Sequence, residues 1–508
     1  MAKNTRPRVR PGLALVALSA AVFLTGWGAS GCDDAPSQPG RPDRTAAGRH
    51  PILLIGLDGV EWDVVLPMLR QGRLPNIARL MEQGFFGRMS TTRPTLSPVI
   101  WTSIATGKSA RQHGIRGFIH KAPNDPEYQR LYTNSDRRTK AFWNILSEEG
   151  LRVHVVGWWM TFPVEKINGV MVAQVNTSTP QRNQAGTGIW KGSLVEGLSG
   201  QVYPPERQDE FLAVVPEVEA EMPELARRVF GTFSGPLSPV GAKLWGACDW
   251  TFRADAIYRR IALRLLKEDA DYDVLAVYFG GTDVMGHRFW RFMLPDRFEM
   301  KPTPQELQDL GDVVWDYYAY MDSVVGELLA AAPADSVVFL VSDHGMIPIN
   351  RKAQFDPEMP AKALNSGGHP NAPDAFFVAC GPGIRKSGMA KPLGELTRGD
   401  LPYVGTIFDM TPTILHLLNL SVGRDMDGGV MKEIVEPEFL ARNPIRMVLT
   451  HTPPDWFESR PALVEGAADT EERLEQLRML GYIDGPGDED KPKDYEGPAD
   501  SDYDEYSG

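Results

Sequence analysis

The sequence predicts an α/β fold in which helices flank a mostly parallel central sheet. Three apolar runs support this prediction, over residues 52–57, 274–279 and 337–342. Continuous apolar runs of this length are typical of strands buried on both faces, as in parallel sheets. The 508 residues can bury one large core or two domains, and the composition, 42% hydrophobic and 23% charged, is that of a globular protein.

The remaining elements alternate between helical and extended patterns. In chain order we expect helices over residues 75–81, 142–146, 252–267, 305–331 and 411–418, and further strands over 153–156 and 375–380. The pattern loosens at about 175–250, where Gly, Gln, Asn and Pro are frequent. We interpret that stretch as an insertion that forms a cap over the site.

The N-terminus has the layout of a secretory signal. Three arginines precede an apolar stretch over residues 13–27, which is shorter than the roughly 20 residues that a membrane-spanning helix needs. The stretch ends in Ala29-Ser30-Gly31-Cys32, which resembles a bacterial lipobox. Residues 1–32 are therefore expected to be a lipoprotein signal peptide with Cys32 as the lipidated residue, although an ordinary cleavage site followed by a coincidental cysteine is the alternative.

The chain ends predict an exported protein that a flexible linker, residues 33–48, tethers to the periplasmic side of the bacterial envelope. We expect the catalytic body over 49–455, a helical extension over 456–483 that includes a short helix at 470–480, and an acidic tail over 484–508. The tail holds ten acids against two lysines, so it cannot bury enough apolar surface to fold.

The distribution of basic residues and the cysteines bear on nucleic-acid binding and on disulfides. The sequence contains no concentrated basic face and no nucleic-acid-binding module. Besides Cys32 the chain has Cys248 and Cys380, and an exported protein can form disulfides. The sequence alone leaves open whether these two cysteines pair.

Acidic and imidazole side chains follow all three apolar runs. Asp58 follows the first run, Asp283 and His287 follow the second, and Asp343 and His344 follow the third. Open parallel sheets place their sites beyond the carboxyl ends of the strands. We therefore expect these side chains to converge on one rim, although the chain separates them widely.

Each pair alone has an ordinary structural alternative. Asp283 and His287 are four residues apart, so on a helix they share a face and can meet one ion or form an exposed pair. Asp343 and His344 are adjacent and would point apart in a strand. Both can be ligands only through a turn, which Gly345 permits.

The acids and imidazoles together indicate a metal site more specifically than any one pair does. His369, in a Ser-Gly-Gly-His segment before a predicted strand, adds a third histidine to the three aspartates. Oxygen and nitrogen ligands without cysteine suit Zn²⁺ or another borderline divalent ion. Six ligands are too many for one tetrahedral ion and suit two ions about 4 Å apart, as used in phosphoryl transfer.

Ser97 is the candidate nucleophile. Followed by Pro98 and a helical pattern that stops at Gly107, Ser97 is expected to be the N-cap of a helix with Pro98 at the first helical position. That position carries positive potential, and a nearby ion can lower the pKa of a hydroxyl there until it attacks. A purely structural cap is the alternative interpretation of Ser97, and Thr95 is the rival nucleophile.

The order of these motifs resembles that of the alkaline phosphatase superfamily, most closely the branch of type I phosphodiesterases and nucleotide pyrophosphatases. The resemblance covers roughly His50 to Lys432. The motifs are Asp58-Gly59, Pro94-Thr95-Leu96-Ser97, Thr106-Gly107, His113-Gly114-Ile115, Asp283-x-x-x-His287, Ser342-Asp343-His344-Gly345-Met346, His369, Gly381-Pro382-Gly383 and Asp409-x-Thr411-Pro412-Thr413.

The resemblance implies two zinc ions on an α/β sheet. Asp283, His287 and His369 would hold one ion. Asp58, Asp343 and His344 would hold the other, and Ser97 would bridge toward it as the nucleophile.

The chain departs from the nucleotide branch in two places. The nucleophile there is usually threonine, and the asparagine expected just after His113-Gly114 is missing from Ile115-Arg116-Gly117-Phe118. Arg116 is a candidate replacement for it, and nucleotide specificity does not follow from the motifs. The sulfatase pattern, Cys or Ser followed by x-Pro-x-Arg, is absent at Ser97, which disfavours sulfate esters.

We therefore expect an exported, lipid-anchored, two-metal hydrolase of phosphate esters, with diesters favoured, that forms a phospho-enzyme at Ser97. A phosphotransferase that modifies an envelope lipid or glycan is the first alternative. A non-catalytic envelope scaffold is the second.

Overall fold

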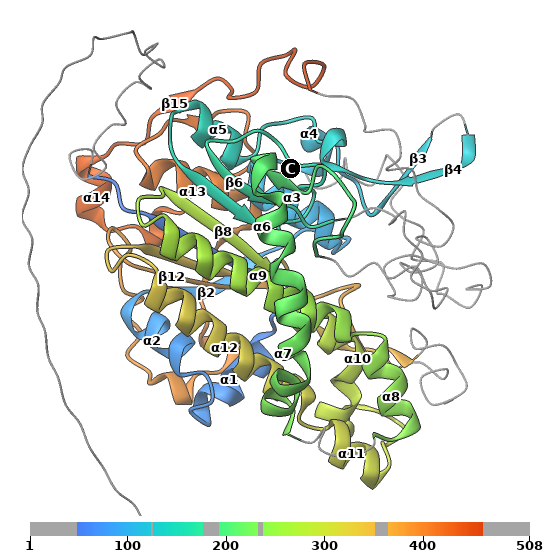
Figure 1. Cartoon of the computed structure of the whole chain (residues 1–508). Coiled ribbons are helices and arrows are strands. Elements are labelled where there is room, and N and C mark those ends of the chain that lie inside the picture. Colours follow the sequence, from blue (N-terminus) through green and yellow to red (C-terminus); the bar gives the residue numbers. More distant parts are fainter. Residues whose placement is uncertain (1–47, 123–124, 176–192, 232–236, 351–363, 461–508) are drawn as a thin grey trace, which may run out of the picture. The chain divides into compact units, whose positions relative to one another are not determined.

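A mixed sheet organises the part of the chain that the computed structural model describes: residues 48–122, 125–175, 193–231, 237–350 and 364–460. Within these residues nine strands form one sheet (Figure 1). In spatial order they are β13 (Tyr403–Thr406), β2 (Phe85–Ser90), β12 (Ala375–Cys380), β9 (Val337–Val341), β1 (Ile52–Leu57), β8 (Val274–Phe279), β5 (Val153–Val156), β6 (Gly169–Val172) and β7 (Val202–Tyr203).

Most neighbouring strands are parallel. The pairs β9–β1, β1–β8, β8–β5, β5–β6 and β13–β2 are parallel, whereas β12 is antiparallel to both of its neighbours and β7 is antiparallel to β6. Three two-stranded pairings stand apart from the sheet: β10 (Ile347–Pro348) with β11 (Gly367–Gly368), β14 (Val422–Gly423) with β15 (Met447–Val448), and β3 (Ile119–Ala122) with β4 (Asp125–Leu131).

Helices cover both faces of the sheet. One face carries α1 (Trp62–Arg70), α2 (Pro75–Gln83), α7 (Val214–Val229), α9 (Asp249–Glu268), α10 (Gly281–Met293) and α12 (Val313–Ala331). The other face carries α3 (Ser97–Thr106), α5 (Phe142–Glu148) and α13 (Met410–Leu417). The shorter helices are α4 (Ala110–His113), α6 (Gln208–Leu212), α8 (Pro239–Gly246), α11 (Pro304–Leu310) and α14 (Pro437–Arg442).

Strand β1 joins the two cores. Leu53, Ile55 and Leu57 pack into the core under α1, α9 and α12, whereas Ile52 and Leu54 pack into the core under α3, α5 and α13. Successive side chains of a strand point to opposite faces, so a strand with helices on both sides must be apolar throughout. This explains the unbroken apolar run that predicts it.

The predicted fold class is confirmed. The three apolar runs are β1, β8 and β9, which are adjacent and parallel. The other predicted helices and strands exist within a few residues of their expected ends, with one error. The single helix predicted over 305–331 is two helices, α11 and α12, separated by Gly311 and Asp312. Gly311 is the C-cap of α11, and glycine is unfavourable in a helix interior.

The described part of the predicted insertion is more regular than its sequence pattern. Helix α7 lies on α9 (Figure 1), where Arg260 bonds to Glu217 at 3.2 Å and to Glu221 at 2.5 Å. The expected role of this region as a cap stays a prediction.

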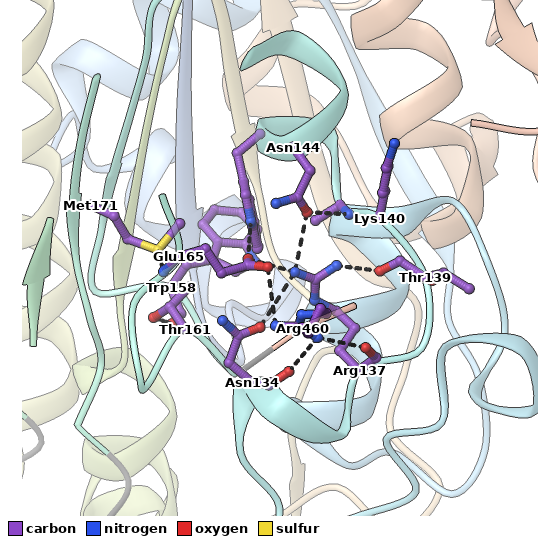
Figure 2. Close-up of polar contacts among 12 residues, drawn as sticks. Asn134, Arg137, Thr139, Lys140, Asn144, Trp158, Thr161, Glu165, Met171 and Arg460 are labelled. Atoms are coloured by element: carbon purple, nitrogen blue, oxygen red, sulfur yellow. Dashed lines mark hydrogen bonds and ion pairs between the residues drawn. The ribbon is translucent and has the colours of Figure 1, made fainter. Parts of the chain in front are cut away.

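A buried ion cluster ties the described C-terminal segment to the body (Figure 2). Arg460 donates to the carbonyl of Asn134 at 2.8 Å and to Glu165 at 3.0 Å, and Arg137 pairs with the same Glu165 at 2.6 Å. Trp143 adds an indole N–H donor to Glu165 at 2.8 Å. Because the buried carboxylate has several charged and neutral donors, the segment up to Arg460 is held firmly against the body.

Several expectations lie outside the described residues: the signal peptide, Cys32, the linker up to residue 47, the helix at 470–480 and the acidic tail. Cys248 and Cys380 are both free thiols. In the described ranges, every helix is either too short or too polar to cross a bilayer.

Replacement of Gly56, the last residue but one of β1, tests how tightly α3 packs on the sheet. A Cβ at this position would lie 2.8 Å from two ring atoms of Trp101. We expect Gly56→Ala to lower the free energy of unfolding by about 1–3 kcal/mol in urea denaturation, because the indole is fully buried and has to shift. The matched control is Gly246→Ala in α8, where a Cβ would meet nothing within 4 Å. Equal effects of the two substitutions would contradict this packing.

Candidate metal centre

The register of three strands brings their carboxyl ends to one edge. Leu57 of β1 lies opposite Phe279 of β8, and Gly56 lies opposite Val341 of β9. Asp58 therefore follows β1 between the ends of its two neighbours. The backbone N–H of Gly59 donates to Asp343 Oδ1 at 3.2 Å, which joins the loop after β1 to the loop after β9.

Helix α10 presents Asp283 and His287 to this edge. Asp283 lies in the first turn, and His287 Nε2 is 3.4 Å from Asp283 Oδ2. The start of α10 is fixed by Asp255 of α9, which accepts the N–H groups of Gly280 and Gly281, each at 3.0 Å. The predicted helical pair is thus present, and the carboxylate that anchors its helix was missed.

His369 reaches the edge through the short pairing of β10 with β11. Ile347 lies opposite Gly368, so the residue after β11 returns to the segment after His344. The rings of His344 and His369 stack with centroids 4.1 Å apart, and His369 Nε2 is 3.8 Å from Asp283 Oδ1. Gly367 permits close approach here, because a Cβ on it would lie 2.4 Å from the Gly286 carbonyl oxygen.

The structure brings all six predicted ligands together. The ligand atoms of Asp58, Asp343 and His344 lie within 4.8 Å of one another, as do those of Asp283, His344 and His369. The resemblance assigns His344 to one group only, whereas here it borders both. His287 contacts the second group through Asp283.

Each histidine turns its Nε2 atom toward the carboxylates. His287 Nδ1 bonds to the carbonyl of Gly367 and His344 Nδ1 to the carbonyl of Gly345, both at 2.9 Å. A ring that donates from Nδ1 keeps a lone pair on Nε2, which is the tautomer that binds a metal ion.

The carboxylates and imidazoles of this site are poorly satisfied by the protein alone. Five buried atoms have no hydrogen-bond partner: Asp58 Oδ1, Asp283 Oδ1, Asp283 Oδ2, Asp343 Oδ2 and His344 Nε2. Leaving buried polar atoms unpaired is costly. Other buried atoms in the described residues also lack a partner, but these five are clustered, with carboxylate oxygens and an imidazole nitrogen close together. The residues present therefore fit divalent cations.

Burial and the neighbouring charges also shift the pKa values of the site residues. Burial, followed by the negative charge of Asp283, raises the pKa of Asp58, and burial together with Asp58 raises the pKa of Asp343 well above its usual value. Burial also lowers the pKa of His369, which keeps its imidazole neutral. Divalent charge would favour the ionised carboxylates, as it does at metal sites generally.

Two further side chains orient Asp58. Trp101 Nε1 donates to Asp58 Oδ2 at 3.0 Å, and the Tyr278 hydroxyl donates to the same oxygen at 2.6 Å. Both bonds leave Oδ1 for an ion. Trp101 lies one helical turn after Ser97, and Tyr278 lies on β8 next to Gly56, but neither spacing signals this role in the sequence.

Ser97 begins α3 one position later in the helix than predicted. Leu96 is the N-cap, since its carbonyl accepts the Ile100 N–H at 3.0 Å, and Ser97 is the first helical residue with Pro98 second. The side chain of Ser97 therefore does not cap the helix. It is 1% exposed. Along the chain Ser97 stands between Thr95, which contacts His369, and Trp101, which contacts Asp58.

Thr95, the rival nucleophile, is engaged with His369. Its hydroxyl donates to the backbone carbonyl of His369 and lies 3.3 Å from His369 Nδ1. Because the hydroxyl hydrogen is used on the carbonyl, the oxygen is left to accept from Nδ1. Thr95 thus orients His369 in the way that backbone carbonyls orient the other two histidines.

A small pocket of about 20 Å³, room for about one water molecule, lies beside Tyr278. Four of its lining side chains are aromatic: Trp159, Trp250, Tyr258 and Tyr278. Trp159 Nε1 and Gln174 Oε1 are buried and have no hydrogen-bond partner in the protein.

Comparisons with known proteins agree with this site chemistry. The family model described as type I phosphodiesterase/nucleotide pyrophosphatase matches residues 52–374. No curated protein sequence matches the chain.

Solved structures that resemble the chain include a nucleotide pyrophosphatase/phosphodiesterase, a sulfatase and a phosphonoacetate hydrolase. An inactive murine ectonucleotide pyrophosphatase/phosphodiesterase 5 in complex with AMP is 13% identical, covers 76% of this chain and 100% of its own, and has a TM-score of 0.42. A 2-O GAG sulfatase is 14% identical (76% and 73% covered, TM-score 0.41). A phosphonoacetate hydrolase from Sinorhizobium meliloti is 17% identical (60% and 59% covered, TM-score 0.35).

The zinc affinity of Thr95 variants distinguishes a residue that orients His369 from a nucleophile. We expect Thr95→Val to weaken binding of one equivalent of Zn²⁺ by about 10–100-fold, because His369 loses the acceptor that orients it. Thr95→Ser keeps the hydroxyl and should bind like the wild type. Competition with a chromogenic chelator measures the affinities. Full zinc affinity combined with complete loss of turnover in Thr95→Val would instead indicate a nucleophile.

Proposed function

Because the chain belongs to the type I phosphodiesterase and nucleotide pyrophosphatase family and is a phosphoric ester hydrolase, we propose that it cleaves phosphodiesters through a serine nucleophile at a centre for two divalent ions. The supporting observation is that six acid and imidazole side chains from distant segments meet at one edge of the sheet, and that four of them have buried ligand atoms without a hydrogen-bond partner. This arrangement is costly for a protein that binds no cation.

Asp58, Asp343 and His344 would hold one ion, and Asp283, His287 and His369 the other. Zn²⁺ suits this set of oxygen and nitrogen ligands. When bound, such ions neutralise charge on a phosphoryl group and lower the pKa of a nearby hydroxyl.

Ser97 would attack phosphorus in line. Its Oγ forms a bond to phosphorus while the bond from phosphorus to the departing alcohol oxygen breaks. Water then cleaves the Ser97 phosphate ester and regenerates the hydroxyl. The start of α3 supports this role, because the positive end of a helix stabilises the charge on a phosphoryl group, and because Ser97 has no capping bond to give up.

The sequence of the N-terminus supports export and a lipid anchor at Cys32, which would place the hydrolase on the periplasmic side of the bacterial envelope. The predicted linker over residues 33–48 would give the catalytic body reach from the membrane.

Replacement of Ser97 tests the mechanism. We expect Ser97→Ala to lower turnover of bis-p-nitrophenyl phosphate by at least about 10³-fold, because the step that forms the covalent ester is lost. Elemental analysis should still find two equivalents of zinc, since the other ligands remain. Unchanged turnover would remove Ser97 from the mechanism, and a wild-type protein without zinc would favour the envelope scaffold.

The same assay separates hydrolysis from transfer. Addition of glycerol as an acceptor should leave most of the phosphoryl product as the hydrolysed monoester. A predominance of glycerol-linked product would favour the phosphotransferase.

A further inference from the structure

Glu61 is a buried carboxylate that connects two loops of the candidate metal centre. It is 1% exposed and lies three residues after Asp58. Its Oε2 accepts the backbone N–H of Met346 at 3.0 Å, and Met346 lies two residues after His344. Together with the bond from Gly59 to Asp343, this contact ties the loop after β1 to the loop after β9 at two points.

The side chain of Glu61 is longer than the side chains that are favoured at a helix N-cap. Glu61 is the N-cap of α1, and its Oε1 accepts the Asp63 N–H at 2.9 Å. Ser, Thr, Asp and Asn are the favoured N-caps, so an aspartate would serve the helix equally well. Only the longer side chain can bond to Asp63 with one oxygen and to Met346 with the other.

The opposite loop is shaped for this carboxylate. The sequence predicts that Gly345 is needed for the backbone conformation of a turn, but Gly345 is not among the glycines with positive φ. The reason for glycine is space: a Cβ at Gly345 would lie 2.2 Å from Glu61 Oε2. The carboxylate thus lies against the backbone directly after His344.

Arg398 supplies the counter-charge. It bonds to Glu61 Oε1 and lies 3.3 Å from Asp63 Oδ1. A buried carboxylate without a cationic partner would be costly, so Arg398 allows Glu61 to remain a strong acceptor for two backbone N–H groups.

We propose that Glu61 is a positioning residue that sets the separation between Asp58 and the Asp343–His344 pair, and thereby the affinity of the ion that those three residues hold. The inference rests on the proposed metal-dependent function. It assigns Glu61 no contact with substrate or ion.

Glu61→Asp provides a direct test, because it keeps the charge and the helix cap and removes the reach to Met346. We expect one of the two zinc equivalents to be lost at a chelator concentration about 10–100-fold lower than in the wild type, as for other groups that orient metal ligands. The second equivalent should keep its affinity. In Co²⁺-substituted protein, the visible absorption should change in the half of the signal that belongs to the weaker site.

Two further variants keep the test decisive. Asp63→Asn also removes a carboxylate beside Arg398, but Asp63 is exposed and does not reach Met346, so both zinc affinities should match the wild type. Arg398→Gln leaves Glu61 without its counter-charge and should weaken the same equivalent as Glu61→Asp, which provides the readout if the latter does not fold.

The outcomes are distinguishable from those of the proposed function. If wild-type protein binds two equivalents and Glu61→Asp and Arg398→Gln bind them with equal affinity, the positioning role is wrong and the metal centre stands. If wild-type protein binds no zinc, the proposed function is wrong and this inference falls with it.

Discussion

The parallel register of β9, β1 and β8 is the constraint on which the site depends. Hydrogen bonds between these strands align Leu57 with Phe279 and Gly56 with Val341. The three chains then leave the sheet at one level. A slip of a single residue would turn the side chains of β1 to the opposite faces, and Asp58 would leave the edge that it now shares with Asp283 and Asp343.

The same alignment crowds negative charge where water is scarce, and much of the surrounding structure holds that charge in place. Trp101 and Tyr278 bond to one oxygen of Asp58, Gly59 bonds to Asp343, and backbone carbonyls fix two of the three imidazoles. All of these groups are uncharged, so they do not neutralise the carboxylates. The protein therefore orients its ligand atoms without satisfying them, which is the property that distinguishes a metal centre from a structural ion cluster such as the one around Glu165.

Much of the fold was predictable because it depends on local patterns. Apolar runs identify strands buried on both faces, and the spacing of Asp283 and His287 places them on one side of a helix. Predictions failed where distant segments decide the outcome. Nothing near Glu61 in the sequence shows that it meets Met346, and nothing near Thr95 shows that it meets His369. The N-cap of α3 is a local error of one residue, since the Leu96 carbonyl accepts the first helical hydrogen bond.

The ligands of the candidate centre span the chain from Asp58 to His369. Strand β9 and the pairing of β10 with β11 are needed before the last histidine is in place. Contacts between residues so far apart in sequence form slowly, since long loops must close first. During synthesis the N-terminal half therefore lacks part of the ligand set, and a nascent chain would complete the proposed cation site only after His369 has been made. Capture of a cation would then be a late step that requires the paired strands.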